Sequence, residues 1–223
     1  MRRSNSHPLA DALLSGTEVL VDVLTDDKVV SSIPIVGTAL KACVALDTVR
    51  DRIFATKLLA FLRTVDAVPR SFRERLTKTL SDNPDESNRI GTTLLLGIER
   101  ATDFSKPRLL ALFFLSFIDR VVTADDLRRL THAVDLTFAD DLEFLISAAQ
   151  EFQITDKFEA TEKFAGLVAG GFVRSVAGQT YDDMGNLYLQ PTPLLRTFLQ
   201  AYTHGKAVSE GLPSPVTGRE TDV

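Results

Sequence analysis

The chain has 223 residues, of which 25 are Lys or Arg and 30 are Asp or Glu, so its formal net charge is −5. Hydrophobic residues make up 44% of the chain and charged residues 25%, a balance that excludes disorder of the whole chain. A single cysteine, Cys43, and three scattered histidines exclude an internal disulfide framework and a zinc module rich in Cys or His.

Uncharged stretches are too short to span a membrane. The longest, Val29–Leu40 and Met184–Leu195, hold about a dozen residues each, whereas a spanning helix needs about 20. The basic start of the chain would suit a signal peptide, but Asp11 and Glu18 interrupt the apolar stretch that follows. We therefore expect a cytoplasmic protein.

Apolar residues recur at helical spacing through most of the chain, and no strand pattern is present before residue 170. We expect helices over 8–27, 35–65, 71–80, 89–102, 105–121, from 124 onward and over 138–150. Capping boxes at Ser71–Glu74 and Thr123–Asp126 mark two helix starts, and Thr137 is expected to cap the last helix. By composition, Ser81–Ser87 is expected to be a loop. The long helix from Ile35 to about Val65 would be the centre of the core.

The pattern changes after about residue 152. The expected elements are a helix over 157–169 that ends at Gly170-Gly171, strands over 172–177 and 187–189 around a polar turn, and a helix over 193–202. The tail, 205–223, is expected to be disordered because it is rich in Gly and Pro. The sequence thus predicts a mostly α fold, a multi-helix bundle over 1–152 followed by a small α+β module over 153–204.

The order of elements in this module, carried by LVAGGFVRSVAG and GNLYLQPTPLLRTFL, resembles that of a winged-helix module. In that family the second strand commonly runs into a short apolar helix, as 187–199 would here. The resemblance implies a winged-helix-like fold. It leaves open whether the module binds DNA or another protein.

A second, fainter resemblance concerns FIDRVVTADD, in which Asp119 and Asp126 lie seven positions apart. TerB-like helical domains carry two half-repeats with acidic residues at this spacing. The resemblance makes Asp119 and Asp126 weak candidates for metal ligands. The glycine of the motif is absent and a possible first copy at Asp66 lacks its second acid at this spacing, so we predict no metal site. The residues themselves suggest another interpretation, in which Asp119 ends one helix and Thr123 and Asp126 cap the next.

No catalytic or cofactor-binding residues are predicted. The chain has no GxSxG, HExxH or phosphate-binding glycine pattern. Neighbouring aspartates at 125–126 and 140–141 suit the first turns of helices, and those at 182–183 suit a hairpin turn. Cys43 is expected to be a buried apolar residue, and His132 a surface or helix-packing residue.

Charge decides between partner classes. From Phe138 to His204 the chain has four cations and nine anions, a balance of 4 − 9 = −5 that opposes binding to phosphates. We expect a non-enzymatic adaptor or regulatory protein that binds another protein, with Lys163 and Arg174 as weak candidates for partner binding. The combined resemblances suggest, by analogy, a component of bacterial stress or anti-phage defence. Two alternatives stay open: a membrane-active, pore-forming-like effector acting through the apolar segment 29–62, and a winged-helix DNA-binding regulator.

Overall fold

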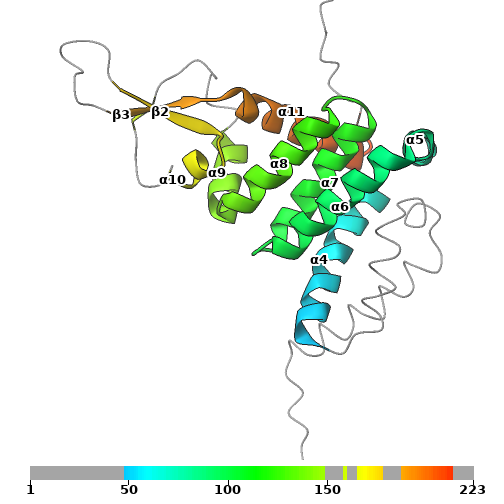
Figure 1. Ribbon diagram of the computed structural model, residues 1–223. Helices are drawn as coiled ribbons and strands as arrows, with labels where there is room; N and C mark the ends of the chain where they lie inside the picture. Colours follow the sequence, from blue (N-terminus) through cyan, green and yellow to red (C-terminus); the bar gives the residue numbers. More distant parts are fainter. Residues whose placement is uncertain (1–47, 149–157, 160–164, 178–186, 213–223) are drawn as a thin grey trace, which may run out of the picture.

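The computed structural model describes residues 48–148, 158–159, 165–177 and 187–212 (Figure 1). These residues form eight helices and a three-stranded antiparallel sheet, so the expected mostly helical class is confirmed. The helical part comprises α4 (Val49–Asp66), α5 (Arg70–Asp82), α6 (Pro84–Arg100), α7 (Ser105–Ile118), α8 (Ala124–Leu136) and α9 (Ala139–Ala148). It is followed by β1 (Phe158–Glu159), α10 (Ala165–Ala169), β2 (Val173–Ala177), β3 (Leu187–Pro191) and α11 (Pro193–Ser209).

Helix α7 occupies the centre of the core. It contacts α4, α5, α6, α8 and α11, and Figure 1 shows these helices gathered around it. Its sequence is apolar on nearly every side, so it can bury side chains against all of these neighbours. Phe113, Phe114 and Leu115 are at most 1% exposed. The helix ends earlier than expected, at Ile118, because Arg120 adopts a positive φ of 59° that turns the chain away.

The predicted capping box at the start of α8 is confirmed. The hydroxyl of Thr123 accepts from the amide of Asp126 at 3.1 Å, and the Asp126 carboxylate accepts from the amide of Thr123 at 2.9 Å. The box expected at Ser71–Glu74 is wrong, because α5 begins after Pro69 and Ser71 lies inside the helix. Thr137 does not cap α9 as expected, since its hydroxyl donates back to Ala133 O at the end of α8.

The loop expected over 81–87 is also wrong. Helix α5 continues to Asp82 and α6 begins at Pro84, which leaves only Asn83 between them. The Asn83 side chain accepts from the amide of Glu86 at 3.3 Å, and proline is well suited to the first position of a helix. The polar residues that suggested a loop therefore form the end of α5 and the start of α6.

Helix α4 begins at Val49, so the single helix expected from Ile35 to about Val65 does not continue through residue 48. Thr48 has extended backbone, with ψ of 152°, and its hydroxyl accepts from the amide of Asp51 at 3.3 Å. This is the geometry of a helix N-cap. Residues 35–47, including Cys43, lie outside the described residues.

The sheet has the strand order β1-β3-β2, with Val173 opposite Pro191 and Ala177 opposite Leu187. The predicted pair of strands is present. The helix expected over 157–169 is wrong at its start, because Phe158–Glu159 is a strand paired with β3. Residues 160–164 lie outside the described residues, and the expected helix is present over Ala165–Ala169 as α10. The predicted stop is confirmed: Gly171 has φ of 75° and ends α10. The expected turn over 178–186 lies outside the described residues.

Helix α11 is longer than the 193–202 expected, and it packs into the bundle. Its partner is α7, where the Ser116 hydroxyl donates to Ala201 O at 2.6 Å and the rings of Phe113 and Phe198 lie 5.4 Å apart, edge to face. The tail expected to be disordered from 205 is thus helical to Ser209. Since Leu167, Phe172 and Phe198 belong to the same core cluster as α7, the core of the described residues does not divide at residue 152.

Candidate functional site

The two aspartates that the TerB-like resemblance singled out each have structural partners. Asp126 belongs to the capping box of α8, and Asp119 is the C-cap of α7. This is the arrangement that the residues themselves suggested for both positions. Within the part of the chain that the structure describes, no three His, Cys, Asp or Glu side chains gather as a metal site would require.

Asp119 is the centre of a partly buried ionic cluster. One carboxylate oxygen accepts from Nε and Nη2 of Arg75, on α5, at 3.2 and 3.1 Å, and the other lies 3.1 Å from Nε2 of His204, on α11. Burial alone would raise the pKa of Asp119, but the hydrogen bond with His204 and the charge of Arg75 together lower the pKa below its ordinary value. The cluster joins three helices, so its evident role is to hold α11 on the bundle.

The sequence did not predict this cluster, because His204 was assigned to the end of the last module and the following residues to a disordered tail. A signal was present: Phe198, Ala201 and Val208 continue the helical spacing beyond residue 202. Gly205 suggested instead that the helix ends there, since glycine normally marks the end of a helix. Here Gly205 lies against the backbone of α7, where a Cβ would come within 2.1 Å of Leu112 O.

A different kind of surface lies where α8, α9 and α10 meet, at the end of the bundle that carries the sheet (Figure 1). We call it the α8–α10 corner, and its exposed apolar side chains are Leu136, Phe138 and Val168. Phe138, between α8 and α9, is 74% exposed, and Leu136 is 49% exposed. The Phe138 ring also borders Gly166 of α10, where a Cβ would lie 3.4 Å from it. Large apolar side chains exposed on adjoining elements are typical of a surface that contacts another molecule.

The charge around the corner is negative. Asp140 and Glu143 are exposed on α9, and Asp141 packs against Gly166. Partial burial and the neighbouring charge of Asp140 raise the pKa of Asp141. Helix α10 itself, with the sequence AGLVA, contains no charged residue.

Of the two weak candidates for partner binding, Lys163 lies outside the described residues. Arg174 is exposed on β2 and donates from Nε and Nη2 to Oε1 of Gln190, on β3, at 3.1 and 2.7 Å. Its guanidinium is thus held along the sheet by a cross-strand partner. His132 is exposed on α8, in agreement with the expected surface position.

Comparison of the chain with protein-family models, with curated proteins and with solved structures found no match. Among the helices described, none combines the length and the apolar character needed to cross a bilayer.

Proposed function

We propose that this protein is a non-enzymatic adaptor or regulatory component that docks another protein at its C-terminal, winged-helix-like end. The carrying observation is the α8–α10 corner, which joins the exposed Phe138 and Leu136 to the carboxylates of α9. Such a surface suits a partner with an apolar anchor flanked by Lys or Arg. The order α10-β2-β3-α11 supports the winged-helix-like interpretation of this end.

Three observations count against the DNA-binding alternative. Helix α10, which would be the end of a recognition helix, has no cation in its sequence. Arg174 is engaged by Gln190. The nearby carboxylates of Asp140 and Glu143 would repel phosphates. We therefore expect affinity for random duplex DNA no tighter than about 10⁻⁴ M at physiological salt.

The membrane-active alternative is weakened by the position of α4, which forms the second part of the segment 29–62. Leu58, Phe61 and Leu62 are at most 1% exposed in the core. Inserting this helix into a bilayer would remove those side chains from their contacts with α6 and α7, which are the helices that α4 packs against.

The proposal is tested by affinity capture from the native host with three full-length baits: wild type, Phe138→Asp and Leu96→Asp. Leu96, on α6, is 45% exposed, so it offers a matched exposed apolar position on a different helix. We expect one dominant protein that is retained by wild type and Leu96→Asp and lost with Phe138→Asp. Equal retention by all three baits would contradict the assignment of the corner.

Fluorescence anisotropy with random duplex DNA tests the competing regulator. Salt-sensitive binding at micromolar concentration would replace the adaptor proposal with DNA binding. The cellular setting, bacterial stress or anti-phage defence, is proposed only by analogy with proteins of similar organisation. It would be supported if the captured partner belonged to such a system.

A further inference from the structure

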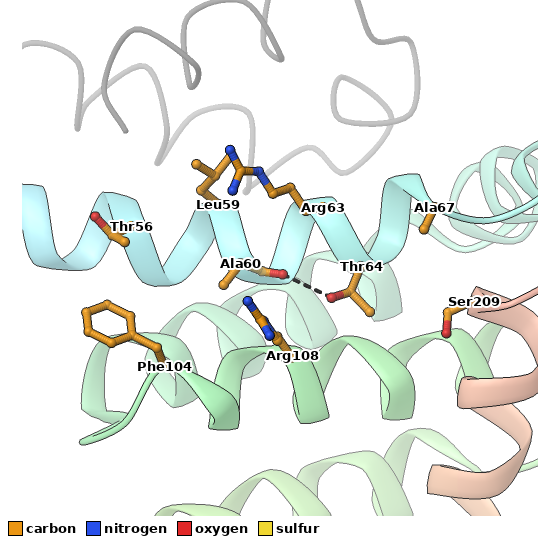
Figure 2. Close-up of a pocket in the computed structure, with 9 residues that line it drawn as sticks. All are labelled: Thr56, Leu59, Ala60, Arg63, Thr64, Ala67, Phe104, Arg108 and Ser209. Carbon is orange, nitrogen blue, oxygen red and sulfur yellow. Dashed lines mark hydrogen bonds between the residues drawn. The ribbon is translucent and has the colours of Figure 1, made fainter. Parts of the chain in front are cut away.

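A groove lies between α4, the start of α7 and the end of α11 (Figure 2). Its volume is about 520 Å³, within the range of about 300–1,000 Å³ that is usual for small-molecule sites. Along α4 it extends from Thr56 to Ala67, a rise of about 16 Å in a helix. The shape therefore suits an elongated small molecule.

The charge of the described residues that line the groove is positive. They include Arg63 and Arg108, both exposed, and no Asp or Glu. Within the described part of the chain, neither arginine forms an ion pair. Asp66, one turn after Arg63 on α4, is instead paired with Arg73 at 3.0 Å. The groove therefore offers two guanidinium groups whose charge is not compensated by a described carboxylate.

The hydroxyl groups in the groove are already used as donors. The hydroxyls of Thr56, Thr64 and Ser209 each donate to a backbone carbonyl of their own helix, at 2.9, 3.0 and 2.9 Å. Because a hydroxyl has a single proton, these side chains keep none for a ligand. The side-chain donors that the lining residues offer are thus the two guanidinium groups, whose planar fork matches the oxygens of a carboxylate or a phosphate.

The remaining lining is apolar and small, apart from one aromatic ring. Leu59, Ala60 and Ala67 belong to α4, and Phe104 precedes α7 and is 49% exposed. Figure 2 shows Arg108 reaching from α7 toward α4, with the ring of Phe104 at the end of the groove near Thr56. A ligand held by Arg108 can therefore lay an apolar chain over Ala60 and against Phe104, which removes apolar surface of both from water.

We propose that this groove binds a small amphiphile that has an oxyanion head, a carboxylate or a phosphate, on an apolar chain. Arg108 binds the head with support from Arg63, and the chain lies over Ala60 toward Phe104. A cationic head is rejected because it would meet two uncompensated arginines. This inference is independent of the proposed docking at the α8–α10 corner, which involves other helices.

Isothermal titration calorimetry of the full-length chain tests the head group with monomeric probes of equal chain length: decanoate, decyl phosphate and decyltrimethylammonium. The two anions should bind wild type about ten-fold or more tightly than the cation. Arg108→Gln should weaken decanoate binding about ten-fold or more, and Arg63→Gln should weaken it less. Arg89→Gln is the matched control, because Arg89 is an exposed cation on α6 that does not line the groove. Its affinity for decanoate should equal that of wild type.

A chain-length series tests the apolar end. Wild type should bind decanoate several-fold more tightly than hexanoate, because the longer chain buries more apolar surface. Phe104→Ala should reduce this ratio and leave the preference for anionic over cationic heads unchanged. Phe138→Asp, which tests the corner, should bind decanoate as wild type does. The two proposals can therefore fail separately.

Four outcomes would overturn the proposal. Equal affinity for decanoate and decyltrimethylammonium would show adsorption of any apolar chain. Equal losses in Arg89→Gln and Arg108→Gln would show a response to net charge without a site. Binding to phosphatidylglycerol vesicles with none to monomeric decanoate would assign this face to a membrane surface, and binding to none of the probes would exclude an oxyanion ligand. Circular dichroism of each variant establishes that the helical fold is retained.

Discussion

Large apolar side chains are buried on helix α7 and exposed at the α8–α10 corner. Phe113 and Leu115 of α7 are fully buried by helices on several sides, whereas Phe138 is 74% exposed beside Gly166 of α10. The first pair holds the bundle together. The second position contributes little to the core, so its apolar surface remains available for a partner. Substitutions in the core should therefore lower stability, whereas substitutions at the corner should change binding and leave stability nearly unchanged.

The largest effect is expected from Leu115→Ala. Leu115 is fully buried among the residues of the core cluster, so truncation removes its contacts and leaves a cavity. The free energy of unfolding should fall by roughly 2–5 kcal/mol, as measured by denaturant titration. A change below about 0.5 kcal/mol, the range typical of surface substitutions, would contradict the central position of α7.

Gly205→Ala should be next, at about 1–3 kcal/mol of destabilisation. The new Cβ would meet the backbone of α7 within 2.1 Å of Leu112 O, so α11 would have to move. Gly166→Ala is the matched control at the corner, because there the close atom is Oδ2 of Asp141, at the end of a side chain that can rotate. Equal losses in the two variants would show that α11 is no more tightly packed than α10.

Asp119→Asn should destabilise the protein by about 1–2 kcal/mol at pH 7, after allowance for partial solvent screening. Since the pKa of Asp119 is lowered by folding, its contribution is complete above the ordinary value near 3.8 and is lost as the pH falls through the folded-state pKa. The difference between wild type and variant should therefore shrink toward pH 3 in thermal denaturation. A difference that is constant with pH would mean that Asp119 acts through packing instead of charge.

Asp141→Asn should change stability in the opposite direction from Asp119→Asn, and by a smaller amount. The pKa of Asp141 is raised in the folded protein, so its charge opposes folding as the pH rises through that pKa. The variant should be slightly more stable than wild type at neutral pH, and the difference should vanish in acid. Asp125→Asn on α8 is a useful contrast, because Arg128 and Arg129 lower the pKa of Asp125 and its removal should not stabilise the protein.

Phe138→Asp should have the smallest effect on stability. Its side chain is largely exposed, so the melting temperature should stay close to that of wild type while binding of the captured partner is lost. A large fall in melting temperature would assign Phe138 to the fold and remove the main support for the corner as a docking surface.

Several features that depend on a few neighbouring residues were predicted correctly from the sequence. The capping box Thr123–Asp126, the stop at Gly171 and the pairing of β2 with β3 all depend on residues close together in the chain. Two errors had local signals as well. Asn83-Pro84 and Thr48-x-x-Asp51 both mark helix starts. The polar composition of residues 81–87 obscured the first, and the apolar spacing over 35–65 obscured the second.

What the sequence by itself determined is the helical class, most of the helix positions and the hairpin, because periodicity and capping act within one or two turns. Only the tertiary structure decided the rest. Strand β1 exists through its pairing with β3. Gly205 stays helical because α11 lies against the α7 backbone, and His204 reaches Asp119 across 85 residues. The exposure of Phe138 has the same origin: burial depends on which elements cover a position, and that is settled only when distant segments pack together.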